Sequence, residues 1–143
     1  MRGLNVRFVA ALAICALLPV ITVVAKDSVS RPFKISGHFQ QVIDLSTWYT
    51  TTEAKGQATH LGMSTLEGSG ITQSLFSGKI VAANRDIIFY DFNSPVFTLT
   101  GGTGRFENVS GEFSAVAYNV VVWEIGTWRI ITGDFTGSGT ITY

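Results

Sequence analysis

Two histidines are the side chains of this chain best suited to metal or proton chemistry. His38 and His60 are the only histidines among 143 residues. Two imidazoles can begin a metal site when a carboxylate joins them. These two are 22 residues apart and fall in different predicted strands, without the short spacing of a ligand pair. We interpret both as structural residues hydrogen-bonded to nearby backbone, and we expect no metal and no cofactor.

Two carboxylates occupy equivalent positions in the sequence. Glu112 and Asp134 each follow a glycine and precede a phenylalanine, Phe113 and Phe135. A carboxylate pair can work as general acid and base. Neighbouring side chains of a strand point to opposite faces, so the acids face solvent if the phenylalanines face inward. We predict the solvent-facing arrangement; the reversed polarity would place the acids in the interior. The sequence assigns no catalytic residue.

A glycine-rich segment, residues 101–106 (GGTGRF), resembles an anion-binding loop in composition. Successive backbone amides and an arginine can cradle a phosphate. Dinucleotide and P-loop sites need a helix directly after the glycines. Residues 106–118 instead have the pattern of strand, turn and strand. We predict a tight corner between strands, with Arg105 paired to a surface carboxylate.

Aromatic side chains are numerous enough to hold an apolar ligand. Such residues line most small-molecule pockets, but in a barrel they also simply fill the core. Both interpretations stay open. The candidate ligand-binding residues are Trp48, Tyr49, His60, Phe89, Tyr118, Trp123 and Trp128.

Six segments share one pattern: a hydroxyl residue, glycine, a polar residue, then a large apolar one. They are residues 36–39, 77–80, 103–106, 110–113, 132–135 and 138–141. Glycine inside a strand marks a bulge or a sharp bend. The spacings between the segments are unequal, which argues against a propeller or solenoid. The pattern predicts an all-β fold, a single antiparallel sheet closed into a barrel, with a sandwich as the alternative.

The predicted strands follow from runs of Thr, Val, Ile, Phe and Tyr between turn residues. They cover residues 33–41, 57–65, 74–82, 87–92, 96–100, 111–122 and 127–143, the last broken near Gly137. Residues 42–55 fit either a short helix or a strand edge, residues 66–71 a loop, and residues 84–86 a hairpin turn. Residues 87–90 and 120–123 are apolar on both faces, so we expect a homo-oligomer that covers the outer face.

The N-terminus has the features of a cleavable signal peptide over residues 1–25. Arg2 and Arg7 precede a long apolar run, and small residues precede Lys26. An uncleaved anchor and a lipid-modified Cys15 are the alternatives. Cleavage removes the only cysteine and leaves one domain, residues 26–143, with eight basic and ten acidic residues. We expect an exported protein, periplasmic or extracellular, that binds no nucleic acid and, after cleavage, no membrane.

Three segments carry a family resemblance: residues 56–62 (GQATHLG), 81–86 (VAANRD) and 99–106 (LTGGTGRF), the last running on to 110–113 (SGEF). They resemble small exported bacterial proteins of unknown function, similar in turn to the allene oxide cyclase and dirigent β-barrels of plants. The resemblance implies an eight-stranded antiparallel barrel with an apolar cavity, often trimeric in the plant members. The hairpin in this group commonly reads Asn-Gly-Asp, whereas Arg85 stands here.

Three functions fit these observations. The first is an exported barrel that holds a small apolar molecule without covalent chemistry. The second is a cofactor-free cyclase or isomerase, in which the cavity orients the substrate. The third is a structural or self-association module with a filled barrel. A hollow interior with a mouth favours binding, and an acid or histidine beside it favours the enzyme.

Overall fold

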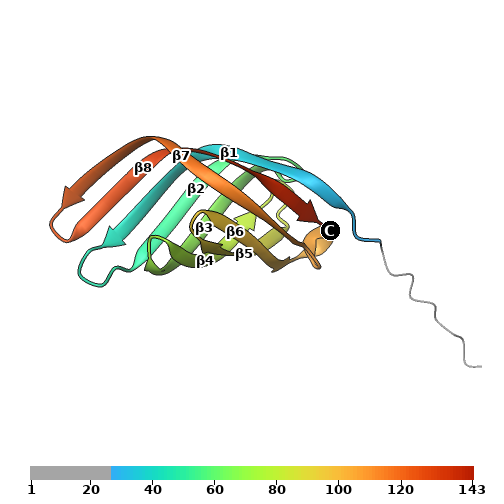
Figure 1. Ribbon diagram of the computed structural model, residues 1–143, viewed down its shortest axis with the longest axis horizontal. Coiled ribbons are helices and arrows are strands. Elements are labelled where there is room, and N and C mark those ends of the chain that lie inside the picture. Colours follow the sequence, from blue (N-terminus) through green and yellow to red (C-terminus); the bar gives the residue numbers. More distant parts are fainter. Residues whose placement is uncertain (1–26) are drawn as a thin grey trace, which may run out of the picture.

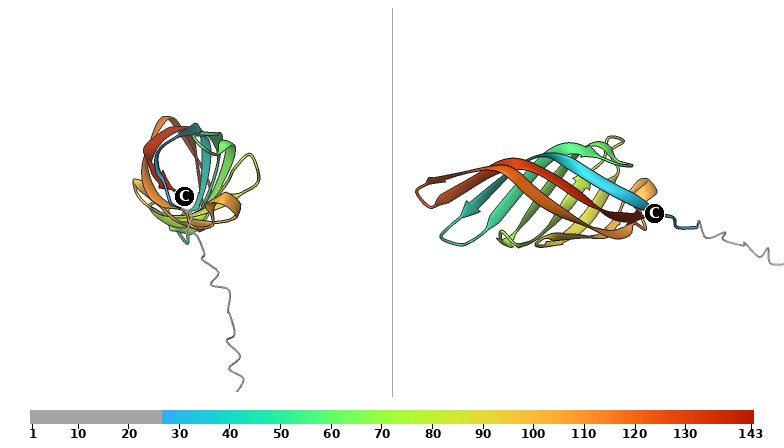
Figure 2. Two further views of the ribbon diagram at one scale, coloured as in Figure 1. Left: turned by 90° about the vertical axis from the view of Figure 1, so that its right-hand side faces the viewer. Right: turned by 45° about the horizontal axis from the view of Figure 1, so that its top comes forward.

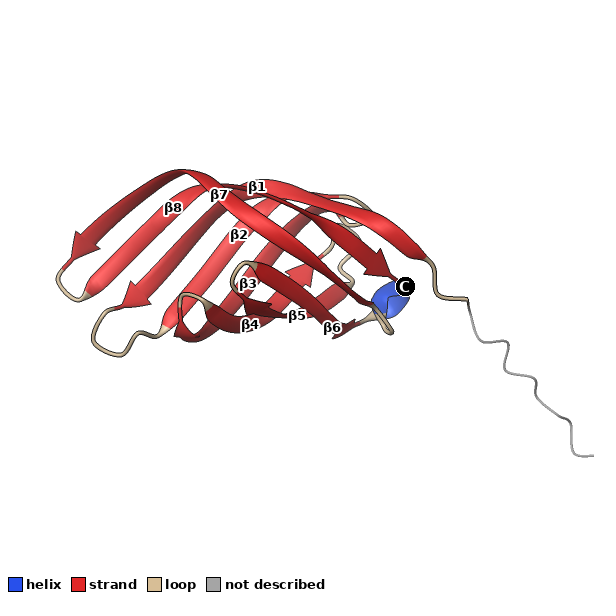
Figure 3. Ribbon diagram, in the orientation of Figure 1, coloured by secondary structure: helices blue, strands red, loops and turns tan. Residues whose placement is uncertain are grey.

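The computed structural model describes residues 27–143, which form eight antiparallel strands and one short 3₁₀ turn (Figures 1 and 3). The predicted signal peptide and Cys15 lie outside the described residues. The elements are β1 (Ser30–Asp44), β2 (Thr50–Ala58), β3 (Gly62–Thr72), β4 (Leu75–Val81), β5 (Ile87–Asn93), β6 (Val96–Gly102), η1 (Gly104–Phe106), β7 (Ser110–Ile125) and β8 (Trp128–Thr142).

The strands close into one barrel in chain order, as Figure 2 shows end-on. Each strand pairs with the next through a short connection, and β1 pairs with β8 over its whole length, from Ser30↔Thr142 to Asp44↔Trp128. This closure confirms the predicted eight-stranded antiparallel barrel and leaves no place for the sandwich. Closing the sheet hides backbone edges that would otherwise be exposed.

The two ends of the barrel differ. The β7–β8 and β1–β2 hairpins extend beyond the shorter strands β3 to β6 at one end, opposite the C-terminus (Figure 1). At the other end the 3₁₀ turn carries Phe106 into the interior, where it is fully buried in the same apolar cluster as Leu61 and Val109. The barrel is therefore plugged at the C-terminal end and open at the hairpin end.

Aromatic side chains fill the middle of the barrel. Phe97 and Phe113 stack with ring centroids 4.5 Å apart, and the Phe33 ring centroid lies 5.0 Å from that of Phe113. Tyr90 is also buried, and its hydroxyl donates a hydrogen bond to the backbone carbonyl of Glu67 at 3.1 Å. Burial, followed by the nearby Glu67 charge, raises the pKa of Tyr90 well above its ordinary value.

Glycines that face the interior mark the corners of the barrel. Gly37 of β1 and Gly56 of β2 are direct partners, and a Cβ at either would lie within 2.2 Å of a carbonyl oxygen of the other strand. Gly68 and Gly78 are also direct partners: a Cβ at Gly78 would lie 1.9 Å from the Glu67 carbonyl oxygen, and one at Gly68 would lie 2.5 Å from the Tyr90 hydroxyl. Only glycine permits backbones to approach so closely. The predicted close approach of backbones at glycines is confirmed for Gly37 and Gly56, but Gly104 lies in η1 rather than in a strand.

Several predicted strands match the structure and others do not. Residues 87–92 and 96–100 lie within β5 and β6 as expected. The predicted strand 57–65 is wrong, because a turn at residues 59–61 separates β2 from β3. Residues 66–71 are part of β3 rather than a loop. Residues 42–55 contain the end of β1, a turn and the start of β2, and no helix. Composition showed strand preference, whereas register across a barrel decides where each strand ends.

Two further local predictions have different outcomes. The expected break near Gly137 is wrong, because β8 runs without interruption from Trp128 to Thr142. The hairpin turn at residues 84–86 is confirmed: Asn84 donates a hydrogen bond to the Asp86 carboxylate at 2.7 Å, and Arg85 has φ +72°. This is a left-handed backbone conformation that favours glycine, so Arg85 occupies it at an energetic cost. Within residues 27–143 no helix is long and apolar enough to cross a membrane.

Candidate functional site: an apolar cavity at the open end of the barrel

The barrel interior is hollow toward its open end. The cavity there has a volume of about 280 Å³. Side chains of all eight strands line it: Phe39, Gln41, Thr52, Ala54, Leu66, Phe76, Phe92, Phe97, Ala115, Ala117, Val120, Ile131 and Phe135, with Gln73 from the β3–β4 turn. The wall is mainly aliphatic and aromatic, so the cavity suits an apolar molecule of modest size.

Small residues on β7 leave the space open. Ala115 and Ala117 point inward from β7. The preceding inward-facing residue of the same strand is the much larger Phe113. Ala117 pairs with Phe135 of β8, whose ring lies 6.5 Å from that of Phe39. A large side chain at either alanine would occupy the volume that these rings enclose. The small residues of β7 thus contribute to the open space, together with the rings that face them.

Three polar side chains give the cavity its hydrogen-bonding groups. Gln41 donates a hydrogen bond from Nε2 to the Thr52 hydroxyl at 3.1 Å, and Gln73 lies at the β3–β4 turn. These neutral amides and hydroxyl can orient a polar atom of a ligand. Among residues 27–143 no carboxylate or imidazole lines this cavity. The groups present offer apolar contact and hydrogen bonds, and none of them has a pKa suited to proton transfer near neutral pH.

None of the seven predicted ligand-binding residues lines the cavity. Trp48 and Tyr49 lie at the β1–β2 turn, and both are about half exposed. Tyr118, Trp123 and Trp128 lie on the outer face of the β7–β8 hairpin. These five are thus on the two hairpins that project at the open end, and the Leu45 amide joins their tips by a hydrogen bond to the Thr127 carbonyl at 2.7 Å.

The other two lie elsewhere. Phe89 points outward from β5, and His60 lies in the β2–β3 turn with φ +69°. The rings that do line the cavity are Phe39, Phe76, Phe92, Phe97 and Phe135. These rings were not among the predicted ligand-binding residues, although the sequence carries a signal for them. Phe39 and Phe135 end two of the six glycine segments, in which the residue after the polar one faces inward.

The two histidines have separate structural partners. His60 Nε2 lies 3.0 Å from the Pro32 carbonyl oxygen, which confirms the predicted backbone partner. For His38 that prediction is wrong, since its Nδ1 lies 3.1 Å from Asp134 Oδ1 on the neighbouring strand. A residue 96 positions away in sequence could be placed there only by barrel closure between β1 and β8. Among residues 27–143 no group of three potential metal ligands occurs.

Asp134 belongs to an exposed polar cluster on the outer face. Asn119 donates a hydrogen bond to its Oδ2 at 2.9 Å, and His38 approaches Oδ1. These contacts, that of Asn119 first, hold the pKa of Asp134 below its ordinary value. Glu112 is exposed too, while Phe113 and Phe135 are buried. The prediction that both acids face outward is confirmed.

The glycine-rich corner is held differently from the prediction. The Arg105 guanidinium donates to the backbone carbonyl of His60 and forms no ion pair with the described residues. The Asp86 carboxylate accepts a hydrogen bond from the Arg105 amide at 3.4 Å. The predicted pairing of the Arg105 side chain with a surface carboxylate is therefore wrong: Asp86 binds the backbone amide of Arg105, and the side chain joins this corner to the β2–β3 turn.

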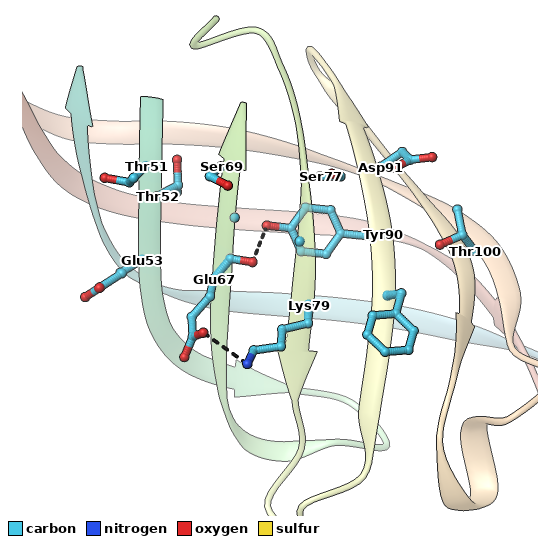
Figure 4. A pocket seen from close by; sticks show the side chains of 13 residues that line it. Thr51, Thr52, Glu53, Glu67, Ser69, Ser77, Lys79, Tyr90, Asp91 and Thr100 are labelled. Atoms are coloured by element: carbon cyan, nitrogen blue, oxygen red, sulfur yellow. Dashed lines mark hydrogen bonds and ion pairs between the residues drawn. The ribbon is translucent and has the colours of Figure 1, made fainter. Parts of the chain in front are cut away.

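An open groove runs over the outer face of β2 to β6 (Figure 4). Its volume is about 590 Å³, and its walls carry Glu53, Glu67, Lys79 and Asp91. Lys79 Nζ and Glu67 Oε2 are 3.3 Å apart, and both side chains are about half exposed. A solvent-screened pair of this kind contributes little to binding or stability. The groove is larger than the cavity, but it encloses a ligand less, so the cavity is the stronger candidate.

Comparison with known proteins finds that no protein-family model, no curated protein and no solved structure matches this chain. The resemblance to the allene oxide cyclase and dirigent barrels therefore stays a prediction.

Proposed function

We propose that this chain is an exported barrel protein, of the allene oxide cyclase and dirigent type, that binds a small apolar molecule non-covalently inside the barrel. The observation that supports it is the cavity of about 280 Å³, close to the lower limit of about 300 Å³ for small-molecule sites. A folded protein normally packs its interior to crystal-like density. An apolar space left open at one end, and surrounded by every strand, is consistent with a ligand site.

Binding draws on the hydrophobic effect more than on specific contacts. Each apolar square ångström removed from water contributes about 25 cal/mol. The Gln41 amide and the Thr52 hydroxyl supply one polar anchor on the wall. The expected ligand is therefore a compact, uncharged and mainly hydrocarbon molecule with at most one or two polar atoms.

Titration with the neutral dye N-phenyl-1-naphthylamine tests the proposal, because the fluorescence of this dye rises in an apolar site. We expect saturable binding with one dye per chain. Ala115→Leu adds three carbon atoms inside the cavity and is expected to raise the dissociation constant of the dye at least about tenfold. Ser114→Leu is the matched control, since Ser114 is the exposed neighbour on the opposite face of β7. Equal effects of the two variants, or no saturable binding, would overturn the proposal.

Export is tested independently of the ligand. Expression of the full chain in a bacterial host, followed by intact-mass measurement of the recovered protein, distinguishes the alternatives for residues 1–25. Cleavage before Lys26 removes the apolar run and Cys15. A protein that keeps this segment, or that carries a lipid on Cys15, would contradict release from the membrane.

A further inference from the structure

β7 has a free backbone edge at the open end of the barrel. It is 16 residues long, whereas its neighbour β6 has seven. The two pair only from Val96↔Ser114 to Leu99↔Gly111, and the Ala115 amide then bonds to the Pro95 carbonyl at 3.2 Å. Beyond this point no strand in the described part of the chain pairs with residues 116–125 on the side away from β8. Their N–H and C=O groups on that side form an unpaired row.

Both faces of this free edge are apolar. Trp123 pairs with Ile130 on the outer face, and Val122 pairs with Ile131, which lines the cavity, on the inner face. Val122 and Trp123 each expose about half of their surface, and Ile125 exposes 66 %. A long, apolar, unpaired strand edge is a template for pairing with another strand.

Charge does not keep a partner away from the edge. Within residues 116–132 the charged side chains are Glu124 and Arg129, and they neutralise each other. Arg129 Nη2 lies 2.6 Å from Glu124 Oε1, and its Nε donates to the same oxygen at 2.8 Å. A second copy of the hairpin thus brings no like-charge repulsion.

The hairpin exposes a large apolar surface that a partner could cover in part. The large apolar side chains of the hairpin expose on the order of 800 Å² in total, comparable with the surface that each partner buries in a standard protein interface. They are Val116, Tyr118, Val120, Val121, Val122, Trp123, Ile125 and Trp128, each between 46 % and 66 % exposed. Hydrocarbon of a bilayer could cover these side chains, but it cannot satisfy the backbone groups of the edge.

We propose that two copies of this chain pair antiparallel along residues 116–125 of β7, so that the sheet of each barrel continues into the other. The edge of a second copy has the same length and the same two apolar faces, and antiparallel pairing of identical edges gives a closed two-fold dimer rather than a filament. Each copy then covers part of the other's open end, beside Ala117 and Val120 of the cavity wall. The proposal rests on the free edge and not on ligand binding.

Sedimentation equilibrium of the full protein, with and without charge on the hairpin, tests the pairing. We expect a dimer whose dissociation constant rises at least about tenfold in Trp123→Lys. Met63→Lys is the matched control, because Met63 is also an exposed apolar residue, on the outer side of β3. Circular dichroism confirms that both variants stay folded. A monomeric wild type, or equal weakening by both variants, would overturn the proposal.

Amide hydrogen exchange separates edge pairing from other kinds of association. In a lone barrel, alternate amides on each side of the register shift between Tyr118 and Val121 bond to β8 and exchange slowly, while those between them face the free edge and exchange fast. Edge pairing makes the fast set slow as protein concentration rises. A dimer in which the fast set stays fast would overturn the proposal. So would a monomer that gains protection in these residues only on phosphatidylglycerol vesicles.

Discussion

The contact between Gly37 and Gly56 gives the sharpest test of how this barrel bends. Alanine at Gly37 would place its Cβ 2.2 Å from the Lys55 carbonyl oxygen, and alanine at Gly56 would place it 2.0 Å from the Ser36 oxygen. Ordinary contact begins near 3.4 Å. The two strands must therefore separate by roughly 1 Å to admit one methyl group, at a position where they are paired on both sides.

The cost follows from overpacking and from lengthened hydrogen bonds. Overpacking in a tight interior costs about 1–3 kcal/mol, and weakening one or two ladder bonds adds about 1 kcal/mol. We expect Gly37→Ala and Gly56→Ala each to lower the free energy of unfolding by about 2–4 kcal/mol. Urea denaturation followed by far-ultraviolet circular dichroism measures this free energy. We expect its slope against urea concentration to be unchanged in the variants.

Ser36→Ala is the control, since Ser36 is the adjacent exposed residue on the outer face of β1. The double variant Gly37→Ala/Gly56→Ala is expected to cost less than the sum of the two single variants, because the separation forced by the first methyl group makes room for the second. If the free energy of unfolding of either single variant lies within about 0.5 kcal/mol of that of Ser36→Ala, the close approach of these backbones is not what shapes the corner.

Three further perturbations have defined outcomes. Tyr90→Phe leaves the Glu67 carbonyl without its buried donor and is expected to lower the free energy of unfolding by about 1–2 kcal/mol in urea denaturation; no change would contradict a role for this bond. Arg85→Gly relieves the positive φ of the hairpin and should raise the melting temperature, whereas a decrease would show that the arginine side chain compensates. Asn119→Ala removes the main cause of the lowered pKa of Asp134, so the pKa should rise toward 3.8 in a carboxyl NMR titration. The stabilisation linked to this lowered pKa is present above the ordinary pKa and is lost as pH falls through the folded value, so a variant that keeps the wild-type acid profile would contradict it.

The alternation of residues allowed much of the barrel to be predicted. In the segments ending in Phe39, Phe113 and Phe135, the polar residue faces outward and the phenylalanine inward, as period-2 geometry requires. The turn at Arg85 also lies where turn residues predicted it. These features depend only on near neighbours in sequence.

Features that depend on register were not accessible in the same way. The turn at residues 59–61 contains no proline, and the apolar residues on both sides resemble one continuous strand. The pairing of His38 with Asp134 requires β1 to lie beside β8, a contact that closes the barrel. Long-range pairing of this kind follows from the whole sheet and from no local pattern.

The location of the cavity was missed for a related reason. Large aromatic residues attract attention as ligand contacts, but the space is created by Ala115 and Ala117, two small residues in an otherwise bulky strand. Whether a small inward-facing residue opens a cavity depends on what the opposite strands contribute. Here the rings of Phe39 and Phe135 line the cavity without filling it.

Methyl NMR during titration with N-phenyl-1-naphthylamine tests most directly whether the barrel interior receives an apolar molecule. Leu66, Val120 and Ile131 line the cavity, whereas Val116 and Ile125 are exposed outside it. Saturable shifts confined to the first three are the expected result. Saturable shifts at Val116 and Ile125 with none at the cavity methyl groups, or no shifts at all, would contradict it.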